Sequence, residues 1–198
     1  LKEMGKNGLV IAENKFSDPF YTFRSEPKLK TPFVTKAQLD KIVEQYPTPF
    51  HLYDEKGIRE RARALNAAFA WNKGFKEYFA VKATPNPYIL KLLHEEGCGC
   101  ACATYTELLL AEAVGITGED VMFSSNVTPE KDMRKAVEMG AYINLDDATH
   151  VEFLERICDG KVPETVCLRY NPGGSFSLGN TIMDMPRDAK YGMTEDQM

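Results

Sequence analysis

Residues 78–103 read YFAVKATPNPYILKLLHEEGCGCACA, and this stretch decides the fold. It opens with an apolar run, Phe79–Val81, and closes with a second strand-like run, Cys98–Ala103. Between the two runs an Asn-Pro pair opens a helix that Gly97 ends, because asparagine caps helices and proline suits the first helical position. The stretch therefore predicts one strand–helix–strand unit.

The same unit recurs toward the C-terminus. The helices that follow begin at capping signals and end at glycines, namely Thr104, Thr128, Gly115, Gly140 and Gly160. The expected strands end near residues 82, 103, 125, 146 and 170, a spacing of roughly 21–24 residues. Strands and helices that alternate at this regular spacing predict parallel strands joined by right-handed crossovers.

An open doubly wound sheet and a (β/α)₈ barrel both fit this pattern. No strand is followed by G-x-G-x-x-G or by G-x-x-x-x-G-K-[ST], which weakens the nucleotide-binding, doubly wound alternative. We therefore expect an α/β fold, an incomplete TIM-type barrel of about five βα units over residues 37–198.

Upstream of this region the character of the chain differs. Residues 1–36 mix short apolar pieces with glycine, proline and charges, so they predict loops and one or two strands without a core of their own. Residues 37–46 predict a short helix, Phe50–Tyr53 a short strand, and Lys56–Trp71 an amphipathic helix.

At the other end, Thr194 and Gln197 form a capping box just before the last residue, Met198. Five strands cannot close a barrel, so we expect residues 1–198 to be part of a longer protein. The alternative is a complete open-sheet domain with a frayed tail.

Composition excludes several classes of protein. The net charge is −5 with no long basic run, which argues against nucleic acid or an anionic membrane as partner. No apolar stretch approaches the roughly 20 residues that cross a bilayer. The charged, glycine-containing N-terminus is not a secretory signal peptide.

Three of the five cysteines alternate along one segment, Cys98, Cys100 and Cys102. On a strand all three point to the same face, and neighbours two apart on one strand make poor disulfide partners. A reduced, cytoplasmic protein with buried thiols is the simpler interpretation. A metal site is the alternative, but the run lacks a second ligand cluster at zinc spacing, so we expect no metal.

Lys82 directly follows the first apolar run. In parallel α/β folds the active residues lie at the carboxyl ends of the strands. A lysine that is desolvated there has a lowered pKa, so its neutral amine is available to react with an aldehyde. A lysine that simply reaches solvent at the end of a strand is the alternative.

The later strands bring further polar groups to the same edge of the sheet, the rim formed by the carboxyl ends of the strands. Arg169 needs an anionic partner, which a cofactor oxygen, a phosphate or an internal carboxylate would provide. Asn126 and Asp146 follow the third and fourth strands. Either residue would serve equally as a helix cap, and for Asp146 the cap is the stronger expectation.

Several segments resemble, in order, the pyridoxal-phosphate (PLP) decarboxylases that have an alanine-racemase-like barrel. Residues 78–86, YFAVKATPN, resemble the cofactor-lysine motif of that family, and residues 47–54, PTPFHLYD, look like the entry segment of diaminopimelate decarboxylases. The further matching blocks are FSSN at 123–126, INLD at 143–146, LRYNPG at 168–173 and AKYGM at 189–193. Together the blocks span residues 47–193.

The resemblance implies that Lys82 forms the Schiff base with PLP and that Arg169 reaches the phenolic oxygen of PLP. It also implies cofactor-binding positions at Ala80 and Asn126. The complete protein would be a homodimer in which residues 1–36 belong to a β-domain. PLP would act as the electron sink when the α-carboxylate of an amino acid leaves as CO₂.

The chain departs from the family pattern on the second strand, where Ala101 takes the place of an aspartate near the cofactor lysine. The stacking histidine, the glycine-rich phosphate loop, and the cysteine and tyrosine of the C-terminal half of the family would lie beyond residue 198. For residues 1–198 alone we therefore expect weak or no cofactor binding and no turnover.

Three functions follow from the resemblance. The first is decarboxylation of meso-diaminopimelate to lysine, which the Asn-Pro-Gly and Lys-Tyr-Gly blocks favour. The second is decarboxylation of ornithine, arginine or carboxynorspermidine by another member of the family. The third is a non-catalytic PLP carrier or regulator, for which Ala101 leaves room.

Overall fold

The computed structural model describes residues 31–173 and 191–198. The chain divides into two compact units, Leu1–Leu52 and Tyr53–Met198. The described part of the first unit holds helix α1, Lys36–Gln45, which Thr35 and Gln38 open with a reciprocal capping box. The β-domain expected for residues 1–36 falls, apart from 31–36, outside the described residues and stays a prediction.

The second unit alternates helices and strands from its first element to its last. Its regular elements are α2 Glu55–Ala68, β1 Tyr78–Ala80, α3 Pro87–Glu95, β2 Gly99–Cys102, α4 Tyr105–Ala113, β3 Val121–Ser124, α5 Glu130–Glu138, β4 Tyr142–Leu145, α6 Thr149–Ile157 and β5 Val166–Leu168. Single 3₁₀ turns lie at η2 Val81–Ala83, η3 Gly118–Asp120 and η4 Glu195–Gln197. Within residues 31–173 and 191–198, no helix is both long and apolar enough to cross a membrane.

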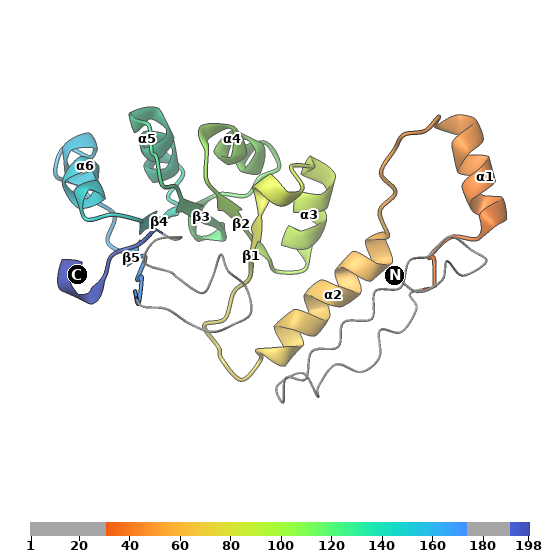
Figure 1. The fold of residues 1–198 in the computed structure, drawn as a ribbon, viewed down its shortest axis with the longest axis horizontal. Helices are drawn as coiled ribbons and strands as arrows, with labels where there is room; N and C mark the ends of the chain where they lie inside the picture. The colour runs from red at the N-terminus through yellow and green to blue at the C-terminus, as the bar shows by residue number, and fades with distance from the viewer. Residues whose placement is uncertain (1–30, 174–190) are drawn as a thin grey trace, which may run out of the picture. The chain divides into compact units, whose positions relative to one another are not determined.

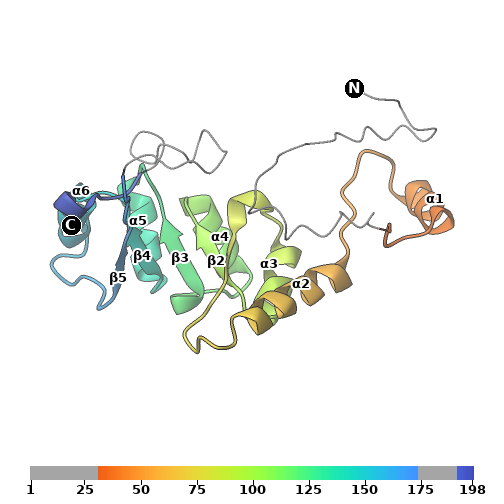
Figure 2. The same cartoon turned by 60° about the horizontal axis from the view of Figure 1, so that its bottom comes forward.

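The five strands form one parallel sheet in the order β1-β2-β3-β4-β5. Helices α3 to α6 follow one another along one face of this sheet (Figure 1), and the turned view shows the strands side by side in chain order (Figure 2). A doubly wound sheet would reverse its strand order and carry helices on both faces. The topology therefore confirms the α/β class and the incomplete barrel.

Burial alternates along β3, along β4 and from Cys100 onward in β2, because successive side chains point to opposite faces. The side chains that face the helices form the main core, with Val81, Cys100, Cys102, Val121, Phe123, Ile143 and Leu145 among its buried members. The alternate positions on the same strands are only partly buried. This parity assigns those alternate positions to the face that lines the interior of a barrel.

The cysteines of β2 belong to the packed face. Cys98, Cys100 and Cys102 are free thiols, each no more than 3% exposed. Burial raises the pKa of Cys100 to about 11 and that of Cys102 to about 12. The expectation of buried thiols is therefore confirmed, and these sulfurs are neutral at physiological pH.

Two expected strand boundaries are wrong. Strand β1 ends at Ala80, and Val81–Ala83 turn into a 3₁₀ helix, so Lys82 lies on a turn beyond the strand. Phe50–Tyr53, expected as a strand, forms none. An apolar run becomes a strand only by pairing its backbone with a neighbouring strand, and none of the described strands pairs with this segment.

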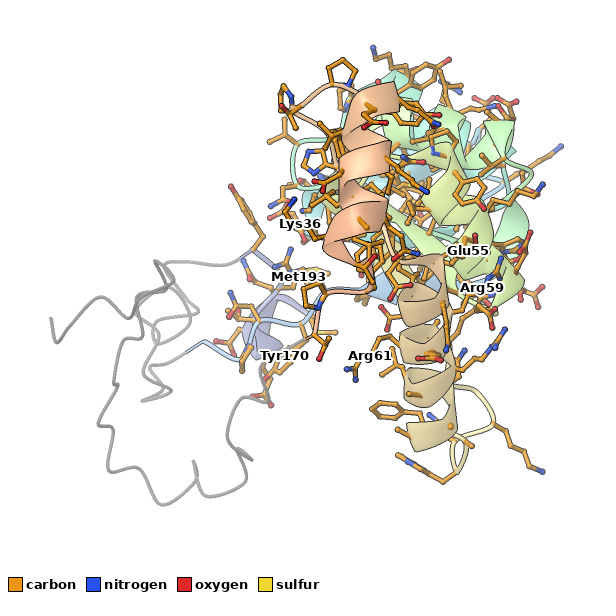
Figure 3. All side chains as sticks on the ribbon, turned by 90° about the vertical axis from the view of Figure 1, so that its right-hand side faces the viewer. Lys36, Glu55, Arg59, Arg61, Tyr170 and Met193 are labelled. Atoms are coloured by element: carbon orange, nitrogen blue, oxygen red, sulfur yellow. The ribbon has the colours of Figure 1, made fainter. Side chains whose placement is uncertain are left out.

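Helices α2 and α3 are joined by a charge cluster around Glu96. Arg63 donates to both oxygens of Glu96 at 2.6 and 2.7 Å, and Arg59 adds a third bond at 2.9 Å. These bonds, that from Arg63 first, lower the pKa of Glu96 to about 2. Arg59 also reaches Glu95 and, within its own helix (Figure 3), Glu55.

We expect Glu96→Gln to lower the melting temperature at pH 7 by a few degrees, because the two arginines lose their shared carboxylate. A depressed pKa contributes stability above the unfolded value near 4.5, and this contribution is lost as the pH falls toward about 2. The gap in melting temperature between wild type and variant should therefore narrow below about pH 4.5. The exposed pair partner Glu60 gives the control variant, Glu60→Gln. A gap that stays constant between pH 7 and pH 3 would contradict this assignment.

Candidate cofactor site at the carboxyl ends of the strands

Lys82 lies in the turn that leaves β1. Val81 is fully buried in the core, while Lys82, on the other side of the turn, is exposed. The turn closes with a hydrogen bond from Thr84 N to Val81 O at 3.1 Å, and Asn86 then caps α3 by accepting from Tyr88 N. Among the residues that the structure describes, Lys82 makes no ion pair. Its exposed side chain corresponds to the alternative of a lysine that reaches solvent and not to the expected desolvated lysine.

Small side chains lie beside this turn on the interior face. Ala80 is the last residue of β1 and is in register with Ala101 of β2. Ala101 and Ala103 alternate with the buried cysteines and are partly exposed. The position where the resemblance implies an aspartate therefore does lie on the interior face, and it carries only a methyl group.

The middle of the rim carries a polar pair that crosses two strands. Ser124 of β3 and Asn144 of β4 are in register, and Asn144 Nδ2 donates to Ser124 Oγ at 2.9 Å. Both residues belong to the FSSN and INLD blocks of the sequence, which do not show that the two side chains pair. Each side chain is partly buried, so the pair fixes two hydrogen-bonding groups at the interior face.

Asn126 lies past the end of β3 and is exposed. Helix α5 starts at Glu130 with Pro129 at its N-cap position, so Asn126 does not cap this helix. The loop between them is held instead by Thr128 Oγ1, which donates to Ser125 O at 3.3 Å. Asn126 remains at the carboxyl rim, and its assignment to the cofactor stays a prediction.

Asp146 and Arg169 form an ion pair between the ends of β4 and β5. Arg169 Nη1 donates to Asp146 Oδ1 at 2.8 Å, and Arg169 N donates to Leu145 O at 2.9 Å. The carboxylate is buried, while about a third of the Arg169 side chain is exposed. The expectation that Asp146 caps a helix is wrong, because Asp147 accepts the bond from Thr149 N at the start of α6 and leaves Asp146 to the arginine.

The segment 191–193 completes this end of the rim. Tyr170 and Met193 form a parallel bridge and lie close together in Figure 3. Met193 N donates to Arg169 O, and Asn171 N donates to Met193 O, both at 2.8 Å. The sequence offered only the Lys-Tyr-Gly block as a signal here, and the pairing itself was missed.

Gly192 explains why that block contains glycine. Its φ is +113°, a conformation that side chains rarely adopt. A Cβ at this position would lie 3.0 Å from both Cγ and the carbonyl oxygen of Arg169. Only glycine lets this segment pack directly against the arginine.

The rim therefore presents two reactive or charged groups from opposite ends of the sheet. The Lys82 amine comes from the β1 edge and the Arg169 guanidinium from the β5 edge, with the Ser124–Asn144 pair between them along the strand order. The structure shows no direct contact between Lys82 and Arg169 in its described part. An amine that can react with an aldehyde and a guanidinium that can bind an oxyanion form a donor set for a small anionic carbonyl compound.

Comparison with known proteins shows to which family the chain belongs. A protein family described as "Pyridoxal-dependent decarboxylase, pyridoxal binding domain" matches residues 55–198. Protein TabA of Pseudomonas amygdali pv. tabaci is 38% identical over 160 residues, which cover 81% of this chain and 36% of TabA. The diaminopimelate decarboxylase of Zymomonas mobilis is 31% identical over 163 residues, which cover 80% of this chain and 38% of that enzyme.

One solved structure is similar to part of this chain. Diaminopimelate decarboxylase from Helicobacter pylori, complexed with L-lysine, has a TM-score of 0.56 and 27% identity, over 61% of this chain and 31% of that chain. The present chain thus spans less than half of the length of these relatives. The family that matches residues 55–198 uses pyridoxal phosphate as its cofactor, and the chain belongs to this family of pyridoxal-dependent decarboxylases.

Proposed function

We propose that the complete protein containing this chain is a PLP-dependent carboxy-lyase acting on an amino acid, and that Lys82 is its cofactor lysine. The observation that carries this proposal is the position of Lys82. Its exposed amine, without an ion-pair partner among the described residues, lies on a turn at the carboxyl end of β1 in a parallel barrel sheet. Catalytic groups of such barrels lie at this end of the strands.

The residues present fit PLP by the chemistry of their donors. The cofactor offers an aldehyde, which requires an amine, and a phenolic oxygen, which a guanidinium stabilises as an anion. Lys82 supplies the amine, and Arg169 supplies a guanidinium that is partly exposed although one nitrogen is bound to Asp146. The methyl groups of Ala101 and Ala103 leave the interior face beside Lys82 open to a ring.

In this proposal the chain holds and orients the reacting groups. Lys82 Nζ would hold the cofactor through its aldehyde group, and the same amine would carry a proton near the substrate when it is not bound to the cofactor. Arg169 holds the phenolic oxygen, and Ala80 and Asn126 line the same end of the barrel. When bound, PLP accepts the electron pair that the α-carboxylate leaves behind as CO₂ departs.

For the substrate we propose meso-diaminopimelate, with lysine as product. The support is that diaminopimelate decarboxylases recur among the relatives, including one at 31% identity over most of this chain. TabA, at 38% identity, is a different member of the family. Because the family has members of more than one kind, ornithine, arginine and carboxynorspermidine are the competing substrates for the same proposed reaction, decarboxylation.

CO₂ release by the complete, PLP-loaded protein tests this choice. We expect turnover with meso-diaminopimelate at a kcat/KM at least about tenfold above that with ornithine, arginine or carboxynorspermidine, a modest ratio for a site that recognises a polar end group. Omitting PLP from the apoprotein gives the matched blank. Higher activity with one of the other three amino acids would overturn the proposed substrate and keep the proposed reaction.

Ala101 favours a second candidate, a PLP-binding homologue without decarboxylase activity. An aspartate at this interior position would place a carboxylate beside the cofactor lysine, and the methyl group provides none. This candidate expects a visible PLP band and no CO₂ from any of the four amino acids. The homodimer, the cytoplasmic location, the β-domain role of residues 1–36 and the inactivity of residues 1–198 alone remain predictions.

A further inference from the structure

We infer that Asp146 is a positioning residue: its buried carboxylate fixes the guanidinium of Arg169 in the direction of the cofactor. The inference rests on the proposed function, since it assigns a role to a neighbour of a proposed PLP-binding residue. It begins from the Asp146–Arg169 ion pair at 2.8 Å.

The two partners of the ion pair are buried to different extents, and this difference indicates which of them is fixed in place by the protein. The Asp146 side chain is 2% exposed, whereas that of Arg169 is 32% exposed. A carboxylate is buried at a cost unless it is paired, and in the described residues Arg169 is its salt-bridge partner. The carboxylate is therefore the fixed member, and it orients an arginine that would otherwise have many rotamers open to solvent.

Among side-chain partners in residues 31–173 and 191–198, Asp146 occupies one donor of this arginine and leaves the others available. A guanidinium has five N–H donors in a planar fork, and the bond from Nη1 to Asp146 Oδ1 uses one of them. With one arm held, the remaining donors point in a restricted set of directions. An arginine held in this way loses less conformational entropy when it binds an oxyanion.

Gly192 restricts the same arginine from another side. The missing Cβ at Gly192 would lie 3.0 Å from Arg169 Cγ, so the segment 191–193 packs against the aliphatic stem. The backbone bond from Met193 N to Arg169 O holds this segment in place. Asp146 thus fixes the charged end of Arg169, and Gly192 limits the stem.

The test uses Asp146→Asn, a change of nearly equal volume, in the complete protein. We expect the dissociation constant for PLP to rise by about tenfold, the low end for loss of a group that orients a ligand-binding side chain. We also expect the visible circular dichroism of bound PLP to change, because it reports how the ring is held. Glu155→Gln, which removes an exposed carboxylate of α6, is the matched control and should alter neither quantity.

A double-mutant cycle separates positioning from a merely structural role. In an Arg169→Ala background, Asp146→Asn should weaken PLP binding no further, because the residue through which it acts is gone. An equal additional loss in that background, or wild-type binding and dichroism in the single variant, would overturn the inference. If Asp146→Asn does not fold, Asp146→Glu decides instead: the longer side chain keeps the buried charge but moves the carboxylate, so Arg169 should be displaced and PLP binding weakened, and wild-type binding and dichroism would overturn the inference.

Borohydride reduction keeps this test apart from the proposed function. If reduction attaches the cofactor to Lys82 in both the wild type and Asp146→Asn, the cofactor lysine is correctly assigned, independently of the role of Asp146. Absence of label on Lys82 in the wild type would refute the proposed function itself.

Discussion

Replacing Lys82 with alanine is expected to abolish covalent retention of PLP in the complete protein and to lower kcat by at least about 10³-fold, within the range for a group that moves protons in the transition state. Lys82 is the exposed amine at the carboxyl end of β1, and no other residue of η2 carries an amine. After borohydride reduction, peptide mapping by mass spectrometry should find the cofactor on Lys82 in the wild type. In the variant the visible absorption band should be lost on dialysis.

The matched control is Lys91→Ala, which removes an exposed lysine from α3, the helix that follows the Lys82 turn. Because its amine extends from the outer helix layer, we expect an unchanged PLP band and unchanged CO₂ release. If Lys82→Ala retained the band after dialysis and reduction, the central assignment would be wrong. Label found on another lysine would place the cofactor elsewhere in the protein.

The largest expected effect on stability belongs to Phe123→Ala, which should cost about 3–5 kcal/mol of unfolding free energy. Phe123 is 1% exposed in the core between the sheet and its helices. It belongs to the same strand as Ser124, whose hydroxyl accepts from Asn144 on the opposite face. A domain is stable by only about 5–15 kcal/mol, so the loss is a large fraction of the total.

Urea denaturation measures this loss as a fall in the midpoint at constant slope. The control Val127→Ala, four residues after Phe123 in the loop that follows β3, removes an exposed side chain and should stay within about 0.5 kcal/mol of the wild type. A Phe123→Ala midpoint equal to that of Val127→Ala would mean that the packed face of the sheet is not the core described above.

Local sequence signals predicted the elements that depend on local physics. The capping boxes at Thr35 and Thr194 and the side-chain cap at Thr104 are all present, because a cap is formed by residues three apart in the chain. Of these, Thr104 and Thr194 were recognised in the sequence. Strands β3 and β4 end at Ser124 and Leu145, each one residue before its expected end near 125 or 146, since each is a short apolar run with helix signals on both sides.

Predictions were less successful for residues whose structure depends on contacts with a distant part of the chain. The run at Phe50–Tyr53 has the composition of a strand but does not form one. Asp146 looked like a helix cap, because aspartate before a helix usually is one. Its neighbour Asp147 accepts from Thr149 N at the start of α6, where Ala148 holds the N-cap position, and the ion pair with Arg169 explains why Asp146 is buried.

The sequence by itself determined the βα alternation with parallel strands, the packed cysteine face and the residues at the carboxyl rim, whereas the observed strand order decided for the incomplete barrel. These follow from periodicities of 2.0 and 3.6 residues, which a linear sequence carries directly. The tertiary structure alone decided the pairs Ser124–Asn144, Asp146–Arg169 and Tyr170–Met193. Each pair joins residues that lie 20 or more positions apart, so it depends on the register between strands, which packing sets and local sequence does not encode.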